Sequence, residues 1–169
     1  MKLLSIIRHG KAETIEEAGD DLQRQLLGKG RKDLRRSARA LARFQPPVDM
    51  IISSPAARAV SSAEALAKEL DYPHSIVLEQ EIYEAAPATL LHVLSTISEG
   101  VEHLLLVGHN PGLTGLISGL CAGSSMRLNV QMPTAALAHI QLELFWWQQV
   151  RWGCGELQAL VYPKLMRKL

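Results

Sequence analysis

Residues 3–10 of the chain read LLSIIRHG, a short apolar run that ends on an arginine, a histidine and a glycine. A run of this length is typical of a strand that is covered on both faces of a sheet. A buried strand explains Leu3 to Ile7, but it does not explain why Arg8 and His9 follow it directly. Gly10, the residue type most tolerant of unusual dihedral angles, ends the stretch. The stretch therefore predicts a buried strand with a candidate functional histidine at its carboxyl end.

Strand and helix patterns alternate along the following hundred residues. Further short apolar runs predict strands at residues 50–53, 75–78 and 103–107. Apolar side chains at three- and four-residue spacing predict helices at residues 31–44, 55–70 and 111–120. Ser54 is expected to be the N-cap of the second of these helices, and Pro55 its first residue. This alternation predicts a layered α/β fold with a largely parallel sheet.

The last third of the chain follows a different pattern. Apolar and polar residues alternate over residues 138–144 and again over residues 156–162, which is the periodicity of half-buried strands. We expect these two strands to pair antiparallel at one edge of the sheet. The predicted fold class is thus a three-layer α/β sandwich with a mostly parallel central sheet and an antiparallel edge.

Length and composition predict one ordinary globular domain covering residues 1–169. Apolar residues make up 47% of the chain and charged residues 21%, and the net charge is +1, so bulk attraction to nucleic acid or membrane is not expected. The segment before Arg8 is too short for a signal-peptide core, and no apolar run reaches the ~20 residues of a membrane span, so we expect a cytoplasmic protein. Cys121 and Cys154 are interpreted as reduced thiols.

Polar side chains gather behind three of the predicted strands. Arg8 and His9 follow the first, Arg58 follows the second one turn into the next helix, and His109 follows the strand at residues 103–107. The carboxyl ends of parallel strands are where α/β sheets bind ligands, and helix N-termini there attract anions. Two arginines and two histidines at that edge would form a cationic cup suited to a phosphoryl group.

Histidine adds a chemical capacity that lysine lacks. A neutral imidazole with one nitrogen held by a backbone carbonyl presents the other as a nucleophile, so His9 could accept a phosphoryl group and pass it to water. His109 would then be protonated against the phosphate, while Arg8 and Arg58 grip its oxygens. A single histidine at a strand end is more often structural, and only the combination in this order favours a catalytic site.

Four blocks of the sequence resemble the histidine phosphatase superfamily, which has the phosphoglycerate mutase-like fold. They are IIRHGKAE, DLQRQLLGKG, IISSPAARAVSSAEAL and LLLVGHNPGL, and together they span roughly residues 2 to 120. Within the superfamily, the short length and the VGHNPG block are most similar to the SixA-type phosphohistidine phosphatases. The resemblance implies that His9 is the phosphorylated nucleophile, that Arg8, Arg58 and His109 complete the phosphate pocket, and that no metal or other cofactor is required.

Several further residues are candidates for the same site. Arg24 matches a position where the SixA type carries an arginine facing the phosphate, although a surface arginine in a loop would read the same way. Gly10 and Asn110 flank the two histidines and are additional phosphate-binding candidates. No DxD or HxxxH cluster supplies the ligand set of a metal phosphatase.

The general acid is the least determined part of the predicted site. Glu84 is the first candidate and Glu81 the second, with surface glutamates in a loop as the alternative interpretation. Imidazole is a good leaving group once it is protonated, so an enzyme that cleaves a P–N bond has less need of a dedicated acid. The lack of a clearly identified general acid therefore favours a phosphohistidine substrate.

Substrate access also bears on the choice of substrate. Residues 71–103 leave room for only a loop and one short helix, which predicts an open, shallow site that could admit a histidine on a protein surface. We expect the partner to be a phosphohistidine-bearing protein, such as a histidine-containing phosphotransfer or carrier protein. The alternatives are a small-molecule phosphomonoesterase or mutase of the same superfamily and a non-catalytic phosphate-binding domain.

Two surface features have alternative interpretations. Residues 29–43 contain seven Lys or Arg and one Asp, which is either a docking face for an acidic protein or a solvated helix face balanced by Glu13, Glu16, Glu17, Asp20 and Asp21. Trp146, Trp147 and Trp152 either form a partner surface or pack the terminal hairpin against the sheet.

Overall fold

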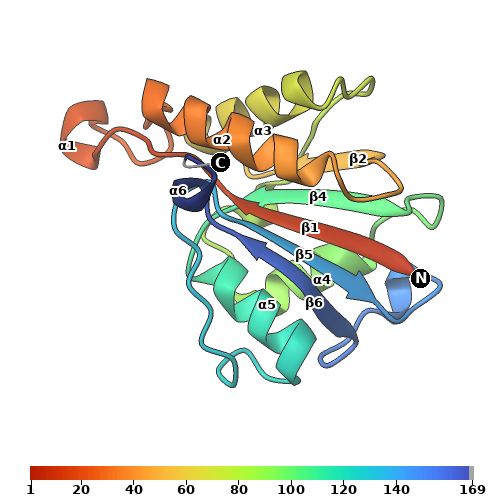
Figure 1. Ribbon diagram of the computed structural model, residues 1–169. Helices are drawn as coiled ribbons and strands as arrows, with labels where there is room; N and C mark the ends of the chain where they lie inside the picture. The colour runs from red at the N-terminus through yellow and green to blue at the C-terminus, as the bar shows by residue number, and fades with distance from the viewer. Residues whose placement is uncertain (168–169) are drawn as a thin grey trace.

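The computed structural model describes residues 1–167, which form a six-stranded sheet in the order β3-β2-β4-β1-β5-β6 (Figure 1). The elements are β1 (Lys2–Arg8), α1 (Ile15–Ala18), α2 (Gly28–Leu41), β2 (Met50–Ser53), α3 (Ala57–Glu69), β3 (Val77–Leu78), the 3₁₀ helix η1 (Gln80–Ile82), α4 (Pro87–Ser95), β4 (His103–Gly108), α5 (Gly112–Ala122), β5 (Leu137–Leu142), the 3₁₀ helix η2 (Trp147–Gln149), β6 (Gly155–Val161) and α6 (Pro163–Met166). Within residues 1–167, none of the helices is both long and apolar enough to cross a membrane.

The sheet lies between two layers of helices, with α2 and α3 on one face and α4 and α5 on the other (Figure 1). Alternate residues of the central strand β4 face the two layers: Leu104 and Leu106 pack with α4 and α5, whereas Leu105 and Val107 pack with α2 and α3. Strands β1, β2, β3 and β4 are parallel, and β5 and β6 add an antiparallel edge. The predicted three-layer sandwich with an antiparallel edge is confirmed.

Two local predictions need correction. The strand expected at residues 75–78 contains only Val77 and Leu78. The N–H of Ile51 on the neighbouring strand donates to the Tyr72 hydroxyl (3.2 Å), so it is not available to pair with a residue before Val77. Helix α3 begins at Ala57 rather than at Pro55, with Ala56 as an N-cap that has no side-chain cap. The Ser54 hydroxyl accepts the Ala56 N–H instead and is also bonded to a site residue described below.

Two of the three tryptophans serve to pack the terminal hairpin. Trp147 is fully buried, and its indole N–H donates to the Val101 carbonyl (2.8 Å). The ring of Trp152 lies so close to Gly119 that a Cβ there would sit 2.4 Å from it. Trp146 alone remains half exposed. The packing interpretation therefore holds for Trp147 and Trp152.

A glycine contact holds helix α2 against the chain that leaves β1. A Cβ on Gly30 would lie 2.5 Å from the Lys11 carbonyl oxygen and 2.7 Å from its nitrogen, and one on Gly10 would lie 3.0 Å from the Gly30 carbonyl oxygen. Only glycine permits this approach of two backbones. Further along α2, the Ser37 hydroxyl donates to the Ala135 carbonyl (2.6 Å), and the Ala135 N–H donates to the carbonyls of Arg8 and His9. The helix is thus fixed to the end of β1 at two points.

This contact predicts different outcomes for two glycines of one helix turn. Gly30→Ala should destabilise the protein by about 1–3 kcal/mol in urea unfolding, because its methyl group collides with backbone that cannot move aside cheaply. Gly28→Ala, whose Cβ would meet nothing within 4 Å, should be neutral or slightly stabilising. Equal stability of the two variants would contradict the close packing.

Candidate active site

The three predicted polar clusters meet at one edge of the sheet because β1, β2 and β4 run parallel and end in register. Arg8 lies opposite Gly108, and Ser53 lies opposite Val107. The His9 N–H then donates to the Gly108 carbonyl (3.1 Å), which carries the ladder one residue past the strand. The rings of His9 and His109 come to a centroid distance of 5.1 Å. The convergence expected from the sequence is therefore present.

His9 has the geometry of a histidine nucleophile. Its Nδ1 donates to the Gly10 carbonyl (2.8 Å), so this nitrogen carries the proton and Nε2 carries the lone pair. The side chain is buried, and burial, aided by the nearby His109, Arg58 and Arg8, lowers the pKa of His9 to about 3. The ring is therefore neutral at pH 7, as nucleophilic attack requires.

Gly10 has a different task from the one expected. Its N–H donates to the Ser62 hydroxyl (3.0 Å), and Ser62 in turn donates to the Arg58 carbonyl. The Gly10 carbonyl receives the His9 ring proton. With both backbone groups engaged, Gly10 positions His9 rather than offering a donor to phosphate.

Three arginines surround the histidines. Arg58 is buried, and its two terminal nitrogens donate to the Asp21 backbone carbonyl (2.6 Å) and carboxylate (3.0 Å). Arg24 donates to the Glu13 carbonyl (2.6 Å) and pairs with the same carboxylate (3.1 Å), so it belongs to the site rather than to a free surface loop. Burial first, and then the charges of Arg24 and Arg58, lower the pKa of Arg8.

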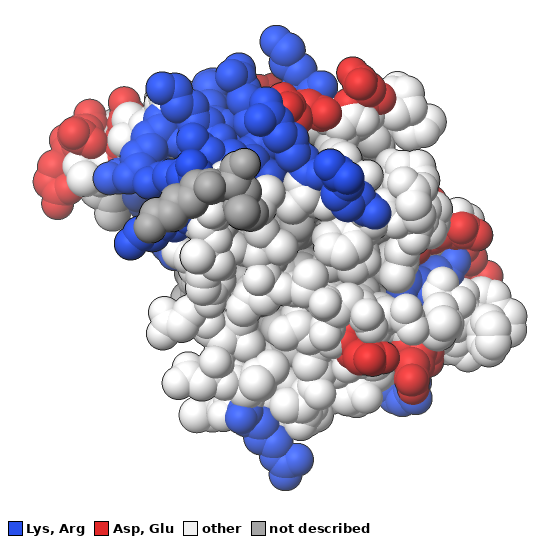
Figure 2. Space-filling model, viewed as in Figure 1, with Lys and Arg blue, Asp and Glu red and all other residues white. Residues whose placement is uncertain are grey.

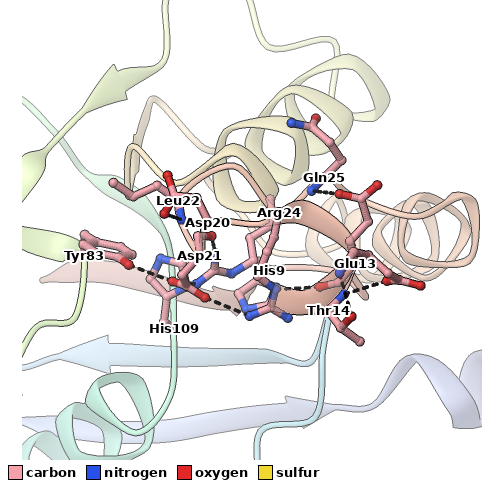
Figure 3. A network of polar contacts seen from close by, with 12 residues as sticks. His9, Glu13, Thr14, Asp20, Asp21, Leu22, Arg24, Gln25, Tyr83 and His109 are labelled. Carbon is pink, nitrogen blue, oxygen red and sulfur yellow. Dashed lines mark hydrogen bonds and ion pairs between the residues drawn. The ribbon is translucent and has the colours of Figure 1, made fainter.

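Asp21 and Tyr83 are site residues that the sequence interpretation missed. The Tyr83 hydroxyl donates to the Asp21 carboxylate (2.7 Å), and in Figure 3 the two side chains point toward one another beside His9, His109 and Arg24. This hydrogen bond, with those from Arg24 and Arg58, lowers the pKa of Asp21 to about 2. The same hydrogen bond between Tyr83 and Asp21, together with burial, raises the pKa of Tyr83 to about 12. The available signal was the spacing of Asp21 and Arg24, which is that of an i,i+3 ion pair.

His109 is bonded through Nε2 to the Ser54 hydroxyl (2.7 Å). Burial first, and then the charge of Arg58, lower the pKa of His109 to about 4. The ring is accordingly neutral at pH 7 in this state, and the expected protonated form requires the charge of a bound anion to raise that pKa. Asn110, the next residue, donates one N–H of its side-chain amide to the Met132 carbonyl (2.9 Å).

Among the described residues, the buried side-chain polar atoms that lack a hydrogen-bond partner belong to residues of this cup. Within residues 1–167, the buried side-chain atoms without a hydrogen-bond partner are Nε of Arg8, Nε of Arg58, Nδ1 of His109 and Oδ1 of Asn110. Native proteins satisfy nearly all buried polar groups, so each exception calls for an explanation such as a bound ion, a water molecule or a catalytic role. Three of the four atoms are nitrogens that can donate to an oxyanion. Across the same residues, no group of three or more His, Cys, Asp or Glu is arranged to hold a metal ion.

A cleft of about 710 Å³ opens beside the cup. Its walls include Asp21, Arg58, Glu84 and His109. Glu84 is exposed and has a left-handed backbone conformation with φ of 51°. Glu81 is exposed on η1 and does not line this cleft. The structure therefore places the first acid candidate at the cleft wall and the second outside it.

The sequence model of the histidine phosphatase superfamily (branch 1) matches residues 4–88, which is half of the chain. The chain belongs to this superfamily. It is 27% identical over 140 residues to the phosphohistidine phosphatase SixA of Escherichia coli K12, a match that covers 82% of this chain and 84% of that protein.

Solved structures show the same fold. The protein histidine phosphatase SixA complexed with tungstate superposes with a TM-score of 0.82 at 24% identity, covering 97% of this chain and 99% of that chain. A mycobacterial glucosyl-3-phosphoglycerate phosphatase, Rv2419c, complexed with VO3 superposes with a TM-score of 0.68 at 15% identity, covering 94% and 98%. These structures show the fold, while the family and the SixA relative support phosphatase activity for this chain.

The ion pairs of Asp21 lead to a test of the site. Asp21→Ala should lower kcat/KM for p-nitrophenyl phosphate by about 10- to 100-fold, because Arg58 and Arg24 lose the charge-assisted bonds that orient them. Asp20→Ala removes a neighbouring exposed carboxylate that bonds only the Leu22 N–H among the described residues, and it should stay within about 2-fold of wild type. Identical kinetics for the two variants would contradict a positioning role for Asp21.

Proposed function

We propose that this protein is a metal-independent phosphatase that hydrolyses phosphohistidine on a protein through a covalent phospho-His9 intermediate. The observation that carries the proposal is the state of His9: buried, neutral, and held through Nδ1 so that Nε2 is free near Arg8 and Arg58. A domain that only binds phosphate has no need of such a ring.

In the first step, the Nε2 lone pair of His9 attacks the phosphorus of the substrate. A new N–P bond forms on His9 as the P–N bond of the substrate phosphohistidine breaks, and the departing imidazole nitrogen takes up a proton. Arg8 and Arg58 stabilise charge on the equatorial oxygens during this transfer. His109, once the anion raises its pKa, donates to the same oxygens.

In the second step, a water molecule attacks the phosphorus of phospho-His9. The N–P bond breaks, the bonding electrons return to Nε2, and inorganic phosphate leaves with the water oxygen. The ring of His9 returns to its neutral form, with the Nδ1 proton still held by the Gly10 carbonyl. No external reductant, oxidant or phosphoryl acceptor other than water is needed.

The titratable groups around the cup support a P–N rather than a P–O substrate. Neither Tyr83 nor Asp21 is suited to donate a proton at pH 7, because Tyr83, with a pKa of about 12, holds its proton tightly and Asp21, with a pKa of about 2, is already ionised. Glu84 lies at the exposed cleft wall. An alkoxide leaving group needs a well-placed proton, whereas an imidazole nitrogen can be protonated from solvent, and this difference favours phosphohistidine.

The short connection between β3 and β4 supports a protein substrate. It contains only the 3₁₀ helix η1 and the nine-residue helix α4, so no long insertion covers the cleft. A small phosphorylated metabolite would keep much of its surface in water there, which weakens binding. The proposed partner is a cytoplasmic phosphotransfer or carrier protein that bears phosphohistidine.

Initial rates on three substrates in excess EDTA test the proposal. We expect kcat/KM for a phosphohistidine peptide to exceed that for a phosphoserine peptide and for 3-phosphoglycerate by at least about 10-fold. A preference for either ester would overturn the phosphohistidine assignment and favour a small-molecule or protein-ester phosphatase. Activity that EDTA abolishes and a metal restores would overturn the metal-independent site.

A nucleophile variant separates catalysis from binding. His9→Ala should lose at least about 1,000-fold in kcat while its unfolding midpoint and its affinity for inorganic phosphate stay close to those of wild type. Retained turnover in this variant would contradict the covalent step. If wild type binds phosphate yet turns over none of the three substrates, the protein is a binding domain.

A further inference from the structure

The solvent-facing side of helix α2 is uniformly basic. Apart from Gly28, every exposed residue of this helix is Lys or Arg, and Figure 2 shows these side chains as one continuous blue area over α2. We call this surface the basic face; it also takes in Arg36, which is partly exposed, and Arg43, which lies just beyond the end of α2. Its residues are Lys29, Arg31, Lys32, Arg35, Arg36, Arg39 and Arg43. Seven of the 18 Lys and Arg of the chain thus lie within 15 residues, although the net charge is only +1.

Few acids neutralise the basic face. Asp33, on the buried side of α2, pairs with Arg36 (2.8 Å), and Glu69 pairs with Arg39 (3.2 Å). In the part of the chain that the structure describes, residues 1–167, the other five cations of the face have no acidic partner within 4.0 Å. The surface is therefore a concentrated positive field.

None of the acids expected to balance this helix forms an ion pair with its cations among the described residues. Glu17 accepts the Thr14 N–H, Glu13 accepts the Gln25 N–H, and Asp21 pairs with Arg24 and Arg58 in the active site. In Figure 2 one red group lies at the left end of the blue area and another borders its upper right side. Direct ion pairs with these acids therefore do not neutralise the helix face.

Repulsion along the helix argues that the pattern serves a purpose other than folding. Arg31 and Arg35, Lys32 and Arg36, and Arg35 and Arg39 are like-charged pairs at i,i+4, which destabilise a helix. A surface helix optimised for stability alone would alternate acids and bases. The alternative purpose is attraction of a negatively charged partner.

The basic face is also rigidly connected to the nucleophile. Its first turn lies on Lys11, two residues after His9, through the glycine contact described above, and Ser37 reaches the His9 carbonyl by way of Ala135. A partner held on α2 is therefore held at a fixed position relative to His9. Such a surface can add binding energy and orientation to a substrate that the open cleft alone holds weakly.

We propose that the basic face docks an acidic protein surface next to the phosphohistidine of the substrate. This inference rests on the proposed function for the class of partner. A protein fits better than nucleic acid, because the exposed residues of α2 include no aromatic side chain on which bases could stack. It fits better than a membrane surface, because the apolar side of α2 is buried in the core and cannot enter lipid.

Two phosphohistidine peptides test the docking. One carries six glutamates beside the phosphohistidine, and the other carries six glutamines at the same positions. Wild type should show a KM at least about 10-fold lower for the acidic peptide at low salt, and the difference should shrink in 0.5 M NaCl. Arg31→Glu/Arg35→Glu should lose this preference through KM, with hydrolysis of the glutamine peptide unchanged within about 2-fold.

The matched control is Arg127→Glu/Arg151→Glu, which makes the same charge change at two exposed arginines outside α2. It should keep the preference for the acidic peptide, and both double variants should unfold at or slightly above the wild-type urea midpoint. If both double variants lost the preference for the acidic peptide equally, the effect would be one of net charge, and this result would overturn the docking proposal. So would equal KM values for the two peptides in wild type.

A binding measurement keeps the docking and the proposed function distinguishable. Fluorescence anisotropy with the unphosphorylated acidic peptide reports docking even if neither phosphohistidine peptide is hydrolysed. The lack of hydrolysis would then contradict the proposed function but not the docking. Wild type should bind this peptide at least about 10-fold more tightly than Arg31→Glu/Arg35→Glu does. Tighter binding of a single-stranded RNA 20-mer, or of vesicles rich in phosphatidylserine, than of the acidic peptide would overturn the protein partner.

Discussion

The Nδ1 atom of His9 donates a 2.8 Å hydrogen bond to the carbonyl of Gly10, and this contact determines which ring nitrogen is free to react. It works only because the backbone after β1 is itself fixed: the His9 N–H bonds the Gly108 carbonyl, the Gly10 N–H bonds Ser62, and the glycine contact presses α2 against Lys11. Burial then keeps the ring neutral. Strand register, helix packing and protonation state therefore all converge on one nitrogen atom.

Gathering three arginines around that nitrogen creates an electrostatic cost that the protein must offset. Like charges repel, and burial weakens the shielding that water provides. Asp21 meets this need by pairing with Arg24 and Arg58 and by accepting the Tyr83 hydroxyl. Its charge is the local counter-ion of the cup, and a phosphoryl dianion would satisfy the donors that Asp21 leaves unpaired. The loop that carries Asp21 is thus part of the site, although it does not directly follow a strand of the sheet.

Much of this arrangement could be predicted because it follows from short-range rules. The parallel strands and their carboxyl ends place Arg8, His9 and His109 together whatever the details of packing. The role of Asp21 could not be predicted, because it depends on where a loop folds back onto Arg58 and Tyr83. Ser54 was misjudged as a helix cap for a related reason: its hydroxyl is bonded to His109, a partner 55 residues away that no local pattern reveals. Long-range side-chain contacts, rather than the backbone, limited the prediction.

The covalent step is the central claim, and trapping the intermediate tests it most directly. Wild type is mixed with a phosphohistidine peptide and quenched in alkali within milliseconds. After digestion, the fragment of the enzyme that contains His9 should carry a single phosphoryl group, and this group should be stable in base and lost in acid. Its amount should approach one per molecule if hydrolysis of phospho-His9 limits the rate. The His9→Ala variant serves as the control and should carry no phosphoryl group. Phosphate on any other residue of wild type, or steady turnover by wild type with no phosphorylated enzyme, would contradict the account.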